Sequence, residues 1–118
     1  MSSRLRVCAS TDLVRGVVKV VDLAPELYGT PREAMVLRDR AGVARAYVNR
    51  CQHLPVPLDG GSRDFLGPDG VHLLCGTHGA LYRPEDGLCV EGPCETELLE
   101  GLTVVETAGE IVLEDPLG

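Results

Sequence analysis

Two short segments of the chain each carry one cysteine and one histidine. Cys51 and His53 form a C-x-H pair, Cys75 and His78 form a C-x-x-H pair, and twenty-one residues separate the pairs. Thiolate sulfur and imidazole nitrogen bind zinc and iron in proteins. A zinc site usually takes two cysteines from one segment and two histidines from the other. The mixed pairs instead suit a centre of two unlike metal ions, in which each segment supplies one ligand to each ion.

This pattern resembles that of the Rieske ferredoxins, and the resemblance runs from about Arg4 to Asp115. In that family, two cysteines bind one iron of a [2Fe–2S] cluster and two histidines bind the other. The resemblance implies one cluster per chain. Cys51 and Cys75 would bind the buried iron, and His53 and His78 would bind the outer iron, whose histidine edges would be the electron exit.

The residues after the second pair extend the resemblance. Gly79 follows the ligand histidine, and the aromatic residue Tyr82 stands four positions after it, as in the second cluster loop of the family. Gly92 and Pro93 resemble the segment that covers the remaining side of the cluster. We therefore expect Gly79, Ala80, Tyr82 and Pro93 to surround the cluster.

The sequence departs from the family pattern at two places, and each departure leads to a prediction. The gap between the ligand pairs is several residues longer than usual, and we assign the extra length to a hairpin through residues 65–70. Ala80 stands where high-potential relatives place a serine that donates a hydrogen bond to a bridging sulfide, whereas Tyr82 keeps a hydroxyl for a cluster sulfur. With one donor fewer, the reduction potential should lie in the lower part of the Rieske range.

The segments that must position these residues read as short strands separated by turns. Branched and apolar residues gather in short runs, bounded by glycine-containing turns and without a sustained helical stripe. Segment 95–100 is also compatible with one helical turn. The pattern predicts an all-β fold, an antiparallel sandwich or barrel of Rieske type, with a cluster-binding subdomain formed by two loops. The expected strands are Arg4–Ala9, Val14–Val21, Ala34–Arg38, Val43–Asn49, Val71–Cys75, Leu102–Thr107 and Glu110–Glu114.

The length and composition of the chain limit the number of domains and membrane-spanning segments that it can contain. A chain of 118 residues predicts one domain, over residues 4–115, without room for the further catalytic domain of an oxygenase. Segment 14–21 is broken by Arg15, Gly16 and Lys19 and is too short to span a membrane. The first residues lack the apolar core of a signal peptide, so the cytoplasm is the expected compartment.

The five cysteines favour reduced thiols and metal ligation over a disulfide framework, because their number is odd and no secretion signal is evident. Cys89 and Cys94 are close enough in sequence to suggest a bridge, but we expect them to be small apolar residues packed beneath the cover segment. Cys8 is expected to pack within a strand, and His72, which alternates with apolar neighbours, to point to solvent.

Charge is distributed unevenly. The formal net charge is −7, and no lysine or arginine follows Arg83, whereas ten acidic residues do. Such a chain could be steered to a basic partner, or the acids could serve solubility alone. Nucleic-acid binding is disfavoured by the acidity and by the few aromatic residues.

Together these features, with the resemblance, imply a one-electron carrier that acts between a flavin- or NAD(P)H-linked reductase and a terminal oxygenase or reductase. It would be a component of an oxidoreductase system and not an enzyme on its own. Two alternatives stay open: a redox or iron sensor that uses the same cluster, and a structural zinc-binding domain.

Overall fold

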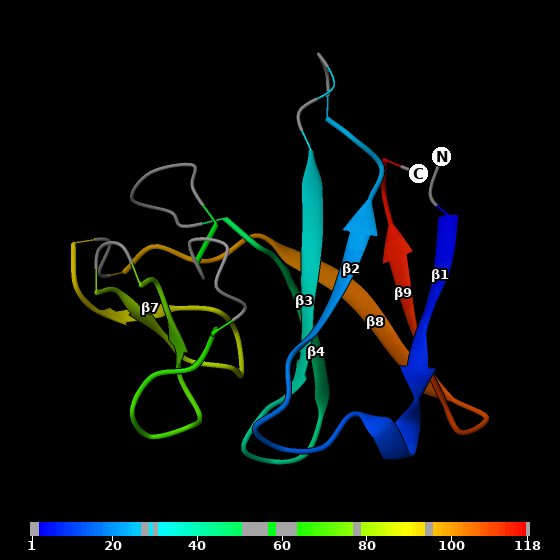
Figure 1. Ribbon diagram of the computed structural model, residues 1–118, viewed down its shortest axis with the longest axis horizontal. Helices are drawn as coiled ribbons and strands as arrows, with labels where there is room; N and C mark the ends of the chain where they lie inside the picture. The colour runs from blue at the N-terminus through cyan, green and yellow to red at the C-terminus, as the bar shows by residue number, and fades with distance from the viewer. Residues whose placement is uncertain are drawn as a thin grey trace.

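A six-stranded antiparallel sheet forms the larger part of the molecule (Figure 1). The computed structural model describes residues 3–26, 29, 31–50, 57–58, 64–76, 79–93 and 96–117. The strand order is β1-β9-β8-β4-β3-β2, and each neighbouring pair is antiparallel. The sheet curls into a nearly closed, barrel-like layer. Its strands are β1 (Ser3–Ala9), β2 (Lys19–Leu23), β3 (Arg32–Arg38), β4 (Ala44–Val48), β8 (Gly101–Thr107) and β9 (Glu110–Asp115), and a 3₁₀ turn, η1 (Ser10–Asp12), follows β1.

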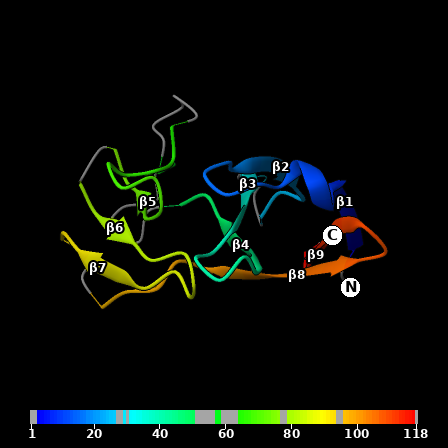
Figure 2. The same ribbon diagram turned by 90° about the horizontal axis from the view of Figure 1, so that it is seen from below.

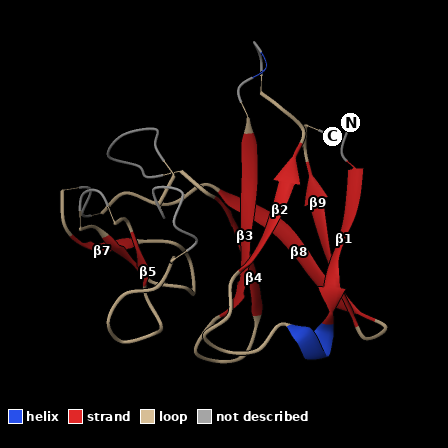
Figure 3. Cartoon of the chain, in the orientation of Figure 1, coloured by secondary structure: helices blue, strands red, loops and turns tan. Residues whose placement is uncertain are grey.

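A small three-stranded sheet lies at the other end of the long axis (Figures 2 and 3). It consists of β5 (Leu73–Leu74), β6 (Leu81–Tyr82) and β7 (Cys89–Glu91), again antiparallel. The chain leaves the large sheet after β4, builds the small sheet, and returns through β8. The predicted all-β fold with antiparallel sheets is therefore confirmed.

β3 is buried on both faces and connects the two cores. Ala34 and Val36 face the core inside the large sheet, whereas Met35 and Leu37 face the core shared with the small sheet. Side chains alternate between the faces of a strand, so a strand covered on both sides needs a continuous apolar run. The sequence Ala-Met-Val-Leu supplies that run. The small sheet is thus held against the large one by packing on β3 and β4.

Several expected strands agree with the structure to within a few residues, and one is wrong. Residues 14–18 do not belong to a strand, because Gly16 adopts a φ of +82° and the amide of Val17 donates to the carbonyl of Val14 in a turn. Pairing with β3 begins only at Lys19. The short strands β6 and β7 were not predicted, since two or three residues carry little periodic signal.

Other expectations can be compared with the described residues. Cys8 packs in the core of the large sheet, as expected. The predicted hairpin near residues 65–70 is present, with a bridge from Leu66 to Leu73. The alternative helical turn at 95–100 is wrong for residues 96–100, because Thr96 lies in a turn with a φ of +77° and Leu98 forms a bridge to Leu88. No helix within the described ranges has the length and apolar character needed to cross a bilayer.

Candidate metal centre

Cys75 is the one predicted ligand within the described residues; Cys51, His53 and His78 lie outside them. Cys75 directly follows β5, and its side chain is fully buried. Its amide donates to the carbonyl of Ala80 and its carbonyl accepts from the amide of Gly79, both over 2.8 Å. Gly79 adopts a φ of +74°, which favours glycine. These bonds form the tight connection between β5 and β6 and fix the backbone of the second ligand segment.

A chain of hydrogen bonds joins the ends of the two ligand segments. The side-chain oxygen of Asn49 accepts from the amide of Leu58 over 2.8 Å, which closes the connection that contains Cys51 and His53. The carbonyl of Leu58 then accepts from the amide of Gly76 over 2.8 Å. Because Gly76 is adjacent to Cys75, the segment after the first pair lies directly against the second.

Asn49 also anchors this arrangement to the large sheet. Its amide donates to the carbonyl of Glu33 over 2.9 Å, and its side-chain nitrogen donates to the Glu33 carboxylate over 2.8 Å. Leu58 is fully buried in the same core as Cys75. The sequence reasoning did not single out Asn49 or Leu58. The position of Asn49, at the end of an expected strand and two residues before the first cysteine, was the available signal.

Gly92 brings the cover segment into contact with Ala80. A Cβ atom at Gly92 would lie 2.7 Å from Cα of Ala80, and the φ of Gly92 is +106°. Only glycine allows this approach, so the cover segment rests directly on the backbone of the second ligand segment. Ala80 is fully buried, whereas Pro93 is exposed at the rim. The structure thus brings Ala80 and the cover segment together.

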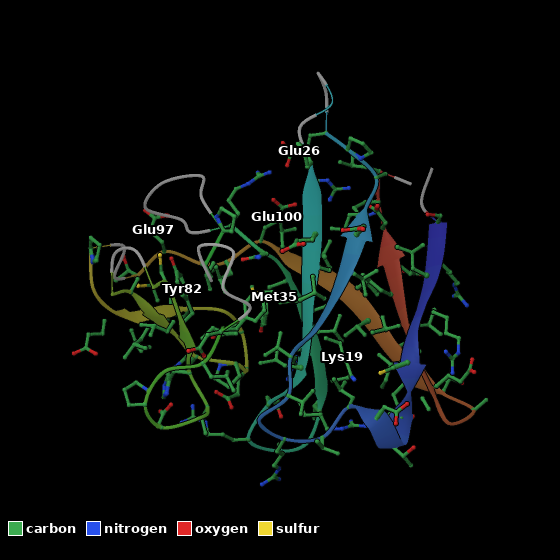
Figure 4. All side chains as sticks on the ribbon, in the orientation of Figure 1. Lys19, Glu26, Met35, Tyr82, Glu97 and Glu100 are labelled. Carbon is green, nitrogen blue, oxygen red and sulfur yellow. The ribbon has the colours of Figure 1, made fainter. Side chains whose placement is uncertain are left out.

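Tyr82 lies on β6 with its ring fully buried (Figure 4). It pairs with Leu73 on one side and Cys89 on the other, and it belongs to the same core cluster as Cys75 and Ala80. Cys89 is also buried there, which agrees with the expected packing role, and its sulfur contacts the carbonyl of Glu91 at 3.3 Å. Cys94 lies outside the described residues.

The described residues fit a bound iron–sulfur cluster. A fully buried thiol stands in a short, glycine-containing connection, and Gly92 brings another backbone segment close to Ala80 in that connection. Iron–sulfur clusters need such close backbone approach, because amide groups stabilise the negative charge on sulfur. Within the described residues no cluster of three metal-binding side chains occurs. This follows from the position of the other three predicted ligands outside those residues.

A buried tyrosine joins the candidate centre to the large sheet. The hydroxyl of Tyr47 on β4 donates to the carbonyl of Pro84 over 2.7 Å, and burial raises the pKa of Tyr47 to about 12. Gly87 packs against the same ring, where a Cβ atom would lie 2.8 Å from Cε1. The sequence reasoning missed this residue, since a tyrosine in a strand carries no signal of its partner.

Ion pairs stabilise the turn that precedes β7. The hydrogen bonds from Arg40 hold the pKa of Glu85 at about 2, and those from Arg83 hold the pKa of Asp86 at about 2.

His72 contacts Asp69 at 2.5 Å in the hairpin of residues 65–70. We predicted that His72 points to solvent. Its side chain is only 21% exposed and is therefore partly buried. It belongs to the hairpin and carries no sign of metal binding.

The comparisons with known proteins agree with this geometry. The family model described as "Rieske [2Fe-2S] domain" matches residues 3–107. No curated protein sequence matches the chain. Among solved structures, the chain is similar to one titled as the reduced complex between oxygenase and ferredoxin in carbazole 1,9a-dioxygenase. The identity is 22% and the TM-score 0.72, over 93% of this chain and 27% of the other.

Two further structures show the same fold. The terminal oxygenase of carbazole 1,9a-dioxygenase from Novosphingobium sp. KA1 is 23% identical with a TM-score of 0.67, over 93% of this chain and 29% of that one. Apo dicamba monooxygenase is 22% identical with a TM-score of 0.61, over 94% and 32%. The chain thus spans between 27% and 32% of the length of these three structures.

Proposed function

Because the chain belongs to the Rieske [2Fe–2S] domain family, we propose that it carries single electrons from a reductase to a terminal oxygenase or similar oxidoreductase. Membership in the family implies a [2Fe–2S] cluster. Such a cluster takes up and releases one electron, at a potential raised by its histidine ligands. We further propose that the donor is a flavin- or NAD(P)H-linked reductase, that the acceptor is a terminal oxygenase or reductase, and that the protein acts in the cytoplasm.

The proposal places the ligands on the two joined segments. Cys51 and Cys75 would hold the inner iron, and His53 and His78 the outer iron. The observation that carries this assignment is the hydrogen bond from the amide of Gly76 to the carbonyl of Leu58. It holds the end of the first ligand segment beside the start of the second, as a cluster with one ligand of each kind from each segment requires.

The surrounding residues would hold the backbone in place and exclude water. Ala80 and Tyr82 are fully buried beside Cys75, Gly79 shapes the β5–β6 connection, and Pro93 lies at the rim of the cover segment. We further propose that residues 4–115 act as a single Rieske domain. We assign no substrate to this chain, which would transfer electrons without a turnover of its own.

The test is electron transfer without substrate chemistry. The protein, reduced by dithionite and freed of excess reductant, should deliver one electron per cluster to an added one-electron acceptor, and it should cycle repeatedly with an NADPH-linked flavoprotein reductase. A sensor would transfer electrons poorly and change its affinity for a partner with oxidation state. A colourless, redox-silent protein that contains zinc would instead show a structural zinc domain.

A further inference from the structure

The outer face of the small sheet is largely apolar and belongs to neither core. Leu73, Tyr82 and Cys89 point into the shared core, where they are fully buried or nearly so. Their neighbours along the strands point the other way, because side chains alternate. The outer face is therefore formed by five apolar side chains of the small sheet and the segment paired with β7, none of them part of either core cluster. They are Leu74, Leu81, Leu88, Val90 and Leu98.

Two of these side chains are strongly exposed. Leu98 is 54% exposed and Val90 is 38% exposed. Leu98 lies opposite Leu88 in an antiparallel bridge, so their side chains share this face with Val90, two residues further along the chain. A contiguous apolar patch on a sheet face is typical of an interaction surface, whereas single exposed leucines are not. We call these five side chains the β7 face.

Unpaired acids border the β7 face. Glu91 and Glu97 are exposed, and neither of their carboxylates forms an ion pair with a described residue. Figure 4 shows Glu97 on the segment that follows β7. Most described arginines are neutralised by a carboxylate, including Arg83, whose amide donates to the carbonyl of Leu88 beside this face. The pairs are Arg4–Glu114, Arg6–Glu110, Arg32–Asp115, Arg38–Glu106, Arg40–Glu85, Arg45–Asp39, Arg50–Glu26 and Arg83–Asp86. The carboxylates of Glu91 and Glu97 thus leave net negative charge beside this face.

The negative charge beside the β7 face indicates which kind of protein could bind there. A second copy related by a two-fold axis would bring together two faces that both carry negative charge, which is unfavourable. A partner with basic side chains around an apolar centre would match both the acids and the apolar patch. The face also lies close to the candidate centre, since β7 leads directly into Gly92 of the cover segment.

We propose that the β7 face is the docking surface for a protein redox partner whose own contact surface is basic around an apolar centre. The proposal rests on the proposed electron-carrier function and names where its partner binds. Docking there would place the partner beside the cover segment, and the acids would steer its approach.

Cytochrome c, a basic redox protein, serves as the probe. The reduced protein is mixed with oxidised cytochrome c in a stopped-flow instrument at low and high ionic strength. Glu91→Gln with Glu97→Gln should lower the bimolecular rate constant at least about threefold at low salt and flatten its salt dependence. The matched control is Asp12→Asn with Asp22→Asn, which removes the same charge from exposed acids of the large-sheet end.

A second pair of variants tests the apolar centre. Val90→Ser with Leu98→Ser should raise the dissociation constant for cytochrome c at least about fivefold in calorimetric titration. Val105→Ser with Leu117→Ser is the control, because Val105 is 38% exposed and Leu117 is 54% exposed, as Val90 and Leu98 are. Both control residues lie on β8 or after β9, away from the small sheet.

The outcomes separate this proposal from the carrier function. Equal effects of the test and control pairs, or no effect of either, would overturn the docking surface. Reduction of ferricyanide, a small anion that needs no docking surface, should be no slower in any variant. If the unmodified protein reduces neither oxidant, the carrier function itself is wrong. If it reduces both while the β7-face variants behave like their controls, only the docking proposal is wrong.

Discussion

The hydroxyl group of Tyr47 donates a buried hydrogen bond to the carbonyl oxygen of Pro84 over 2.7 Å. This bond ties β4 of the large sheet to the turn between β6 and β7, so it fixes the small sheet relative to the large one. Gly87 packs against the same ring. Since the small sheet carries the second ligand segment and the cover segment, its attachment bears on the geometry of the candidate centre.

We expect Tyr47→Phe to lower the free energy of unfolding by about 1–3 kcal/mol, because the Pro84 carbonyl would be left buried without its partner. Burial raises the pKa of Tyr47 to about 12, above the ordinary value near 10. The folded state thus holds this proton more tightly than the unfolded state. Stability should be fully present below pH of about 10 and decline as pH rises towards about 12.

Urea denaturation between pH 7 and 11.5 measures both effects. The variant should lose stability at neutral pH and show a weaker decline in alkali. An unchanged alkaline decline in Tyr47→Phe would mean that another group causes it.

Asn49→Ala should weaken metal retention more than it weakens the fold. The substitution removes the acceptor for the amide of Leu58 and the bond to Glu33, so the first ligand segment loses its closure. Release of iron to a chelator at 25 °C, followed by absorbance, should be several-fold faster. The comparison variant is Asp115→Asn, which should destabilise the fold at the far end of the large sheet without speeding release. Equal release from both variants would contradict a local role for Asn49.

The ion pair of Arg32 with Asp115 predicts acid sensitivity. Burial disfavours the Asp115 carboxylate, but hydrogen bonds from Arg32 and from the amides of Ala24 and Leu117 outweigh this and lower its pKa. A lowered pKa in the folded state means that stability is present above the unfolded value of about 3.9 and is lost as pH falls through the folded value.

Asp115→Asn should therefore cost about 3–5 kcal/mol at pH 7, because Arg32 would keep a buried charge without a counter-ion. The cost should shrink as the pH falls below about 4. The adjacent control Glu114→Gln breaks an exposed pair with Arg4 and should cost less than about 1 kcal/mol. Thermal unfolding from pH 2.5 to 7 checks both. A cost for Asp115→Asn that does not vary with pH would contradict this linkage.

Much of the large sheet could be predicted from the sequence, because β3, β4, β8 and β9 are long enough to show apolar runs or alternation. The small sheet could not. β6 has two residues, and its position depends on the bond of Cys75 with Ala80 and on packing of Tyr82, which are tertiary contacts. Residues 14–18 read as a strand by composition, yet the positive φ of Gly16 turns the chain there.

The sequence predicts which residues of the candidate centre bind the metal. It does not predict which residues hold the two ligand segments together. Cysteine and histidine spacing predicts four ligands, since few other uses require that pattern. The residues that join the ligand segments, Asn49 and Leu58, act through a side-chain bond and a backbone bond, and neither leaves a periodic mark in the sequence.

Ala80→Ser tests the environment of the cluster. If Ala80 occupies the position of a missing hydroxyl donor, the serine should add a hydrogen bond to a sulfur that becomes more negative on reduction. A preference of about 1–2 kcal/mol for the reduced state corresponds to a rise of about 40–90 mV in the potential. Tyr82→Phe should lower the potential by a comparable amount. Protein-film voltammetry measures both, and a serine variant that keeps its cluster without a rise would show that the alignment of this segment is wrong.

The account depends most on mixed cysteine and histidine ligation by Cys51, His53, Cys75 and His78. The direct measurement is metal analysis combined with pulsed electron paramagnetic resonance of the reduced protein labelled with ¹⁵N-histidine. We predict two irons per chain, as a [2Fe–2S] cluster requires, and strong couplings to two histidine nitrogens. Cys75→Ala should lose the cluster, so both the bound iron and the couplings to histidine nitrogens should be absent in this variant. Zinc in place of iron, or a cluster without histidine coupling, would contradict the account.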